Sequence, residues 1–327
     1  MNKILLVGGE GYIGSVLCRR LLDSGYKVTS MDNFTYGNRT IPLSNIFHQN
    51  YKFVNEDMRS HTELENLFKS NDIVVLLAGL VGDPITKLYP KDSKLINDIG
   101  VKNIIDLSNQ HSVKKFIFIS TCSNYGLIKD NEKADENFEL KPLSLYAKSK
   151  VNAENYILSL KDNTDMTATI LRFATAFGLS PRMRFDLTIS QFARELYFGN
   201  ELEVFDEKTW RPYCHIIDFA RLIIKVIESP EEKVNFEVFN AGSNENNATK
   251  KMIVEKILNK IPNGIIKYKE HGSDPRNYRV NFEKVQSTLG FEASKSIDDG
   301  IEELIDAFEN KIFISNNDIY GNYTIES

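Results

Sequence analysis

The sequence is poor in the residues that build disulfide frameworks and metal centres. It has three cysteines among 327 residues, at positions 18, 122 and 214, and no CxxC pair. Its five histidines show no HxH, HxxxH or HExxH spacing. We therefore expect neither a disulfide-stapled fold nor a His- or Cys-based metal site. The cysteines are expected to be free thiols in a reducing cytoplasm.

Long apolar runs and an excess of positive charge are also missing. The longest apolar run, 73–81, is well short of the ~18 residues of a membrane span. The net charge is -5 and the isoelectric point about 5.7, with basic residues scattered along the chain. Neither a membrane nor a nucleic acid is an expected partner. The chain starts directly with a strand pattern rather than a charged-then-apolar leader, so we expect a cytoplasmic protein without a cleaved segment.

The stretch from Gly8 to Gly14 is the strongest local signal. Residues 4–7 predict a buried strand, glycines follow at 8, 11 and 14, and the apolar spacing of 12–22 predicts a helix. Such a strand, turn and helix lets backbone N–H groups around Tyr12 and Ile13 approach a pyrophosphate at the helix N-terminus. A glycine turn that only packs helix on strand is the alternative, and a second element must separate the two.

Asp32 is that second element. It ends the next predicted strand, 27–31, at the spacing where an acidic side chain accepts the ribose hydroxyls of a dinucleotide. A carboxylate at this position repels a 2′-phosphate, and Asn33 rather than an arginine follows it. The sequence therefore favours NAD over NADP.

Strand and helix patterns alternate through the first half, with further strands predicted at 51–55, 73–78 and 115–120 and helices at 63–69, 92–109 and 146–160. The second half is more irregular, and it begins with a predicted strand at 167–172 and a helix at 187–198. Apolar strands alternating with helices are typical of an α/β fold. We predict a doubly wound parallel sheet of the Rossmann type with a smaller α/β C-terminal substrate lobe. Ligands then lie beyond the carboxyl ends of the strands.

Tyr146 and Lys150 lie four residues apart in the helix predicted at 146–160, so they share one helical face. A nearby ammonium stabilises a phenolate, whose reference pKa is near 10. Tyr146 can then accept the proton of a sugar or alcohol hydroxyl, which Thr121 can hold from the end of the 115–120 strand. A buried helix tyrosine without a catalytic role is the alternative.

Taken as an ordered set, these features resemble the extended short-chain dehydrogenases, the nucleotide-sugar epimerase/dehydratase family, over roughly residues 1–309. The residues that carry the resemblance are Gly8, Gly11, Gly14, Asp32, Asp57, Met58, Leu77, Ala78, Gly79, Asn97, Thr121, Tyr125, Gly126, Tyr146, Lys150, Arg211 and Asp218. It implies that Tyr146 is the acid/base, that Lys150 anchors the nicotinamide ribose and that Thr121 orients the substrate. It also implies Asp57 and Met58 near the adenine, and a homodimer built through a helix bundle.

One departure from the family pattern narrows the reaction. Dehydratases that the chain resembles carry an acidic pair directly after the catalytic threonine, whereas this chain has Cys122 and Ser123 there. With one acid/base, we expect oxidation and reduction at a single carbinol, C4 of a nucleotide-diphosphate sugar, by a 4-epimerase or 4-dehydrogenase. NAD(P)H-dependent reduction of a 4-keto sugar, or a catalytically silent NAD-binding regulator, are the alternatives. Thr121, Cys122 and Ser123 are expected to contact the substrate, with a small buried cysteine as the alternative at position 122.

Four arginines are predicted to contact the substrate. Arg182 and Arg184 lie in a loop before a predicted helix, where forked donors suit phosphate or carboxylate, although solvated surface arginines fit the pattern as well. Arg211 and Arg276 correspond to positions at which the family that the chain resembles grips the pyrophosphate.

The expected domain division follows from these assignments. Residues 1–175 form the NAD-binding domain, to which segments near 212–242 return, and 176–310 form mainly the substrate lobe. The segment 311–327 is rich in asparagine and aperiodic, so we expect a loosely packed tail.

Overall fold

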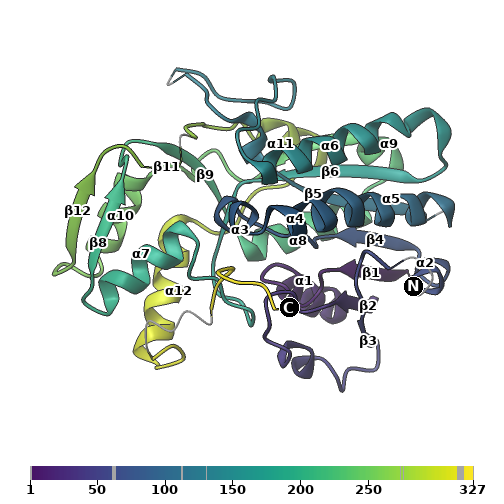
Figure 1. Cartoon of the computed structure of the whole chain (residues 1–327), viewed down its shortest axis with the longest axis horizontal. Coiled ribbons are helices and arrows are strands. Elements are labelled where there is room, and N and C mark those ends of the chain that lie inside the picture. The colour runs from purple at the N-terminus through teal and green to yellow at the C-terminus, as the bar shows by residue number, and fades with distance from the viewer. Residues whose placement is uncertain are drawn as a thin grey trace.

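A seven-stranded parallel sheet forms the centre of the first lobe in the computed structural model (Figure 1). The structure describes residues 2–60, 64–111, 113–129, 131–272, 274, 276–314 and 320–326. The strand order is β10-β6-β5-β4-β1-β2-β3. The strands are β1 (Lys3–Val7), β2 (Lys27–Asp32), β3 (Tyr51–Asn55), β4 (Ile73–Leu76), β5 (Lys115–Thr121), β6 (Thr167–Phe173) and β10 (Glu237–Ala241). The predicted doubly wound α/β sheet is confirmed.

Helices cover both faces of this sheet, which is why its central strands are apolar along their whole length. The helices α1 (Gly14–Asp23) and α8 (Ile216–Glu228) pack on one face. The helices α2 (Glu65–Lys69), α5 (Val101–Gln110) and α6 (Leu145–Ser159) pack on the other. The side chains of β4 are all buried between these two layers.

The helix predicted over 92–109 is divided. The chain forms α4 (Pro90–Ser93), the π-helical η2 (Lys94–Gly100) and then α5. Shorter elements of the first lobe are η1 (Ile41–Ser44), α3 (Asp83–Leu88), η3 (Cys122–Tyr125), η4 (Lys161–Asn163) and α9 (Glu231–Val234). Residue 63, where one predicted helix begins, lies outside the described residues.

The second lobe has two small sheets and its own core. One sheet has the order β11-β9-β7 and the other pairs β12 with β8. Its elements are β7 (Thr175–Phe177), α7 (Thr188–Tyr197), β8 (Glu201–Phe205), β9 (Trp210–His215), β11 (Asn247–Thr249), α10 (Lys250–Leu258), β12 (Ile265–Lys269) and α12 (Ile297–Glu309). Between β12 and α12, the helix α11 (Glu283–Leu289) returns to the first lobe and packs beside β10. The range 176–310, predicted to form mainly the second lobe, therefore includes a helix that belongs to the first.

The described part of the C-terminal segment, 320–326, is packed rather than loose. Asn322 is 7% exposed, and Ile325 packs against the core of the first lobe. The Glu326 N–H donates to the Thr35 carbonyl oxygen at 2.8 Å, so this part of the segment lies on the loop that follows β2. The expectation of a loosely packed tail is therefore wrong for these residues. No helix in the described ranges is long and apolar enough to cross a membrane.

Candidate functional site

A cavity of about 670 Å³ lies at the carboxyl ends of β1 and β4, where the strand order reverses, and it extends to the second lobe. Most of the site residues predicted from the sequence line this one cavity. They are Gly8, Gly11, Tyr12, Ile13, Gly14, Asp32, Asn33, Asp57, Met58, Leu77, Ala78, Gly79, Thr121, Ser123, Tyr146, Arg182, Arg184, Arg211 and Arg276. Lys150 lies beneath its wall, and Cys122 points away from it.

The glycine loop leaves space beside the backbone on one side and none on the other. A Cβ on Gly14 would lie 2.3 Å from the carbonyl oxygen of Gly8, so only glycine lets α1 start this close to the strand. Gly8 itself has a φ of 86°. A Cβ on Gly11 would meet only the Gly8 oxygen, at 3.4 Å, and would otherwise project into the cavity. The loop is thus open where a diphosphate must approach the backbone.

Asp32 is held at the end of β2 by backbone donors. Its carboxylate accepts hydrogen bonds from the N–H of Phe34 (2.9 Å) and the N–H of Glu10 (3.1 Å). Burial raises the pKa of Asp32, and these hydrogen bonds act in the opposite direction. Beside it, the Asn33 amide donates to Asp57 at 2.7 Å. Asp32 and Asp57, the two acidic residues predicted for the adenosine end of the cofactor, are therefore linked through Asn33.

Tyr146 and Lys150 share a face of α6, as predicted. The Lys150 Nζ lies 5.8 Å from the centre of the Tyr146 ring. Burial raises the pKa of Tyr146, while the positive charges of Arg184 and Arg276 act to lower it. Thr121 ends β5 on the same cavity wall, and its Oγ1 accepts a hydrogen bond from the Ser123 N–H at 3.1 Å. Thr121 and Tyr146 thus line one cavity, and Lys150 lies on the Tyr146 face of α6 beneath its wall.

Cys122 does not belong with them. Its Sγ donates to the carbonyl oxygen of Arg172 at 3.0 Å, and the side chain packs in the core at 1% exposure. Burial raises the pKa of the Cys122 thiol well above its ordinary value. The expected contact between Cys122 and a substrate is therefore corrected: Ser123, not Cys122, lines the cavity, and Cys122 is a small buried core residue.

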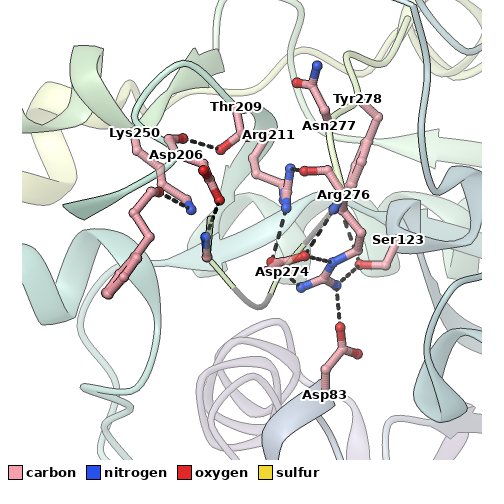
Figure 2. A network of polar contacts seen from close by, with 12 residues as sticks. Asp83, Ser123, Asp206, Thr209, Arg211, Lys250, Asp274, Arg276, Asn277 and Tyr278 are labelled. Atoms are coloured by element: carbon pink, nitrogen blue, oxygen red, sulfur yellow. Dashed lines mark hydrogen bonds and ion pairs between the residues drawn. The ribbon is translucent and has the colours of Figure 1, made fainter. Parts of the chain in front are cut away.

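Two arginines at the far end of the cavity share one carboxylate, as Figure 2 shows. The Arg276 guanidinium binds Asp274 through Nε (2.8 Å) and Nη2 (2.7 Å), and Arg211 Nη2 binds the same carboxylate at 3.0 Å. These guanidinium groups hold the pKa of Asp274 well below its usual range. Arg276 Nη1 also contacts Ser123 Oγ and Asp83, both at 3.1 Å. The network therefore connects the second lobe to β4 and β5 loops of the first.

Arg182 and Arg184 are buried, which excludes the alternative of solvated surface arginines. Arg184 makes a two-point ion pair with Asp186, at 3.1 and 2.5 Å. Arg182 instead donates to Asn322 Oδ1 at 2.6 Å and to the Gly321 carbonyl oxygen at 3.2 Å. The two neighbouring arginines therefore have different partners and different surroundings.

Several cavity residues were not found from the sequence. They include Tyr36, Asp83, Lys250, Asp274, Asn322 and Tyr323. Asp274, two residues before Arg276, could have been suspected as its partner, since a carboxylate two residues away can reach a guanidinium. For Asn322 no local signal exists, because its partners lie 140 and 241 residues away along the chain.

Residues 4–242 match the sequence profile of the NAD dependent epimerase/dehydratase family. The chain belongs to this family. Among curated relatives, the chain is 27% identical to UDP-glucose 4-epimerase of Corynebacterium glutamicum over 88% of this chain and 90% of the relative. It is 24% identical to the Bacillus subtilis UDP-glucose 4-epimerase over 92% of this chain and 94% of that relative. The chain also superposes on a crystal structure of UDP-glucuronic acid 4-epimerase from Bacillus cereus in complex with UDP-glucuronic acid and NAD. The TM-score is 0.83 at 26% identity, and the superposition covers 94% of this chain and 99% of the other.

As an epimerase/dehydratase family member, the chain is an NAD-dependent enzyme, and its residues fit this cofactor. Gly11 leaves the backbone open to the cavity at the start of α1, which suits a diphosphate, and the Asp32 carboxylate at the end of β2 suits ribose hydroxyls. Arg182 adds a buried positive charge to the same cavity. In the described ranges no three His, Cys, Asp or Glu side chains cluster in a way that could hold a metal ion.

Proposed function

We propose that this enzyme oxidises and reduces one carbinol, C4, of a nucleotide-diphosphate sugar, as a 4-epimerase or 4-dehydrogenase. The observation that carries the proposal is that Thr121 and Tyr146 line the same cavity as the glycine loop. Arg211 and Arg276, which share the Asp274 carboxylate, line this cavity as well. The names of the relatives, UDP-sugar 4-epimerases, support the same substrate class and carbon.

The first lobe supplies the residues that would hold NAD. They are the loop from Gly8 to Gly14, Asp32 and Asn33, Asp57 and Met58, and Leu77 to Gly79, with Lys150 beneath. When bound, NAD accepts a hydride from the sugar carbon and can return it.

Tyr146 moves the proton in this proposal. Its phenol oxygen takes the proton of the C4 hydroxyl, which Thr121 Oγ1 orients, and later gives it back. Burial opposes deprotonation of Tyr146, so a positive charge must compensate. The Lys150 ammonium lies 5.8 Å from the centre of the Tyr146 ring, and a charge at about 6 Å contributes roughly 3 kcal/mol at an effective dielectric of 20. Lys150 therefore has to be protonated for Tyr146 to act as a base.

Ser123 argues for redox chemistry at one carbon rather than dehydration. Eliminating water needs a second acid and base, but Ser123 Oγ is engaged by the Tyr278 hydroxyl (3.2 Å) and by Arg276 (3.1 Å). The same arginine and Arg211 provide forked donors for the diphosphate of the substrate. Arg184, whose charge acts on Tyr146, lies toward the sugar end.

The test follows the sugar and the cofactor together. The purified protein is incubated with UDP-, GDP-, CDP- and dTDP-sugars, beginning with UDP-glucose and UDP-glucuronic acid. A new 4-epimer without net NADH indicates an epimerase, and accumulating NADH indicates a dehydrogenase. Consumption of added NADH with a 4-keto sugar would replace the proposal by the reductase. No change with any substrate would favour the silent regulator.

The catalytic assignment has its own variant pair. Tyr146→Phe should lower turnover by about a thousandfold and retain NAD. Tyr156→Phe, on the side of α6 that meets α5, where its hydroxyl bonds Asp106, should leave turnover within about twofold. Wild-type turnover in Tyr146→Phe would contradict the assignment.

We also propose that two copies form a homodimer through α3, η2 and the start of α6. Leu88, Leu95, Ile99 and Leu145 are exposed on these elements and Leu143 just before α6, and α6 packs against both α3 and η2. Exposed apolar side chains gathered in this way favour a protein interface. Sedimentation velocity should give a dimer, and Leu95→Lys with Ile99→Lys should give a monomer. A cytoplasmic location is proposed as well, supported by three buried cysteines that are all unpaired.

A further inference from the structure

Arg182 is a buried cation that lacks an acidic partner. Its side chain is 5% exposed, and among the described residues no carboxylate lies within ion-pair distance of it. Its two hydrogen bonds go to neutral oxygens, of Asn322 and Gly321. Arg184, Arg211 and Arg276 each pair with an aspartate. Burying a guanidinium without a counter-charge is unfavourable, so its position points to an anion that binds there.

The surroundings of Arg182 belong to the cofactor side of the cavity. Its guanidinium lies 5.0 Å from the centre of the Tyr36 ring, and Tyr36 is in the loop that follows Asp32. Burial and the neighbouring Arg184 lower the pKa of Arg182 to about 10, and the charges of Asp186 and Asp32 act to raise it. Tyr36 in turn accepts a hydrogen bond from the Val81 N–H at 2.8 Å, after β4. Arg182 therefore faces the two loops between which a dinucleotide lies.

The C-terminal segment 320–326, which we call the strap, connects these loops. The Phe185 N–H donates to the Tyr320 carbonyl oxygen at 2.7 Å, so the strap is anchored on the second lobe. In its middle, Asn322 accepts from Arg182 and donates to the Val81 carbonyl oxygen at 3.1 Å. At its end, the Glu326 N–H donates to the Thr35 carbonyl oxygen at 2.8 Å.

The strap is therefore also a wall of the site. Asn322 and Tyr323 line the cavity together with the loop 32–37 and with Arg182. The side chain of Glu326 adds an ion pair to Arg39, at 2.8 Å, beyond the Asp32 loop. The strap contacts thus cover one side of the cavity, and their opening would ease the exit of a bound ligand.

We propose that Arg182 binds the anionic diphosphate of NAD rather than the sugar substrate, and that the strap holds Arg182 in place and retains the cofactor between turnovers. The sequence-based assignment of Arg182 to the substrate is replaced by this one. The inference depends on NAD binding alone and not on which sugar the enzyme converts, so it can fail while the proposed function stands.

The role of Arg182 is tested by binding, without turnover. Affinities for ADP-ribose, which carries the diphosphate, and for adenosine, which does not, are measured by calorimetry on the full-length protein. Arg182→Ala should weaken ADP-ribose by about tenfold or more and leave adenosine within about twofold. Arg182→Lys should fall between wild type and Arg182→Ala. Equal weakening of both ligands, or no weakening of ADP-ribose, would overturn the assignment.

The role of the strap is tested by exchange. Protein loaded with NAD is diluted into excess deuterium-labelled NAD, and native mass spectrometry follows the replacement. Asn322→Ala should speed exchange by about fivefold or more. The matched control is Asn310→Ala, which removes an asparagine that only caps α12 through Asp306. If Asn322→Ala exchanges at the wild-type rate, the strap does not retain the cofactor. Thermal unfolding of the cofactor-free proteins separates this effect from a loss of folding.

Discussion

The Lys150 ammonium donates a 2.7 Å hydrogen bond to the Ile119 carbonyl oxygen and lies 4.6 Å from the centre of the Phe118 ring. The end of β5 thus fixes a charge beneath the face of α6 that carries Tyr146. This charge is buried at 5% exposure, and burial lowers the pKa of Lys150 to about 8, against the charge of Glu154.

A pH-dependent stability follows for the cofactor-free enzyme. The folded-state pKa of Lys150, about 8, lies below the ordinary value of 10.5, so between these values the unfolded chain binds more protons and stability rises with pH. Raising the pH from 7 to 10 should increase the contribution of Lys150 to the free energy of unfolding by about 2 to 3 kcal/mol. Urea unfolding of wild type and Lys150→Met at both pH values measures it. Identical pH dependence in both proteins would contradict the prediction.

The glycine loop provides a matched pair of variants. Gly14→Ala should destabilise the cofactor-free protein by about 2 to 3 kcal/mol, because its Cβ would lie 2.3 Å from the Gly8 oxygen. Gly11→Ala should unfold near the wild-type temperature but bind NAD at least about tenfold more weakly, because its Cβ enters the cavity. Calorimetry and thermal unfolding of both variants check this. Wild-type NAD affinity in Gly11→Ala would mean that the diphosphate lies elsewhere.

Cys122 should be dispensable for turnover. Because its thiol is buried and donates to the Arg172 carbonyl oxygen, Cys122→Ala should cost about 1 kcal/mol of stability and leave kcat within about twofold. The native protein should also resist thiol-reactive reagents at this position, which peptide mapping after labelling would show. A hundredfold fall in kcat would restore a catalytic role for this thiol.

Arg276 should act through its forked geometry rather than its charge alone. Arg276→Lys keeps the charge but cannot bind Asp274 at two points while reaching Ser123 and Asp83. Affinity for UDP, measured by calorimetry, should fall by about tenfold. Arg279→Lys is the control, because Arg279 stacks on Trp210 and does not line the cavity. Equal losses in the two variants would show that the effect is not local to the Arg276 network.

The sheet and the dinucleotide loop could be predicted because their signals are local. Four consecutive apolar residues before Gly8 specify a buried strand, and glycine spacing specifies the turn that follows. Asp32 and Thr121 could be placed because parallel strands end at one edge of a sheet, so the residues after each strand converge there.

Contacts made far along the chain could not be predicted. The direction in which Cys122 points depends on how η3 leaves β5, which spacing does not determine. The burial of Arg182 depends on Asn322, and the asparagine-rich composition around that residue favoured an unpacked tail. The composition of 311–327 shows that this segment has too few apolar residues to form a core of its own. It does not show whether the segment can pack against surfaces that other parts of the chain form.

Because the chain passes several times between the two lobes, neither lobe can be cut out or exchanged between related enzymes as one continuous segment. After β9 the chain returns to the first lobe as α8, α9 and β10, and it returns again as α11. A fragment ending near residue 175 would lack β10 and leave β6 as an open sheet edge, which favours aggregation. Exchanging substrate preference between relatives would therefore require separate grafts over 175–215, 247–269 and 297–309, each joined at a crossing between the lobes.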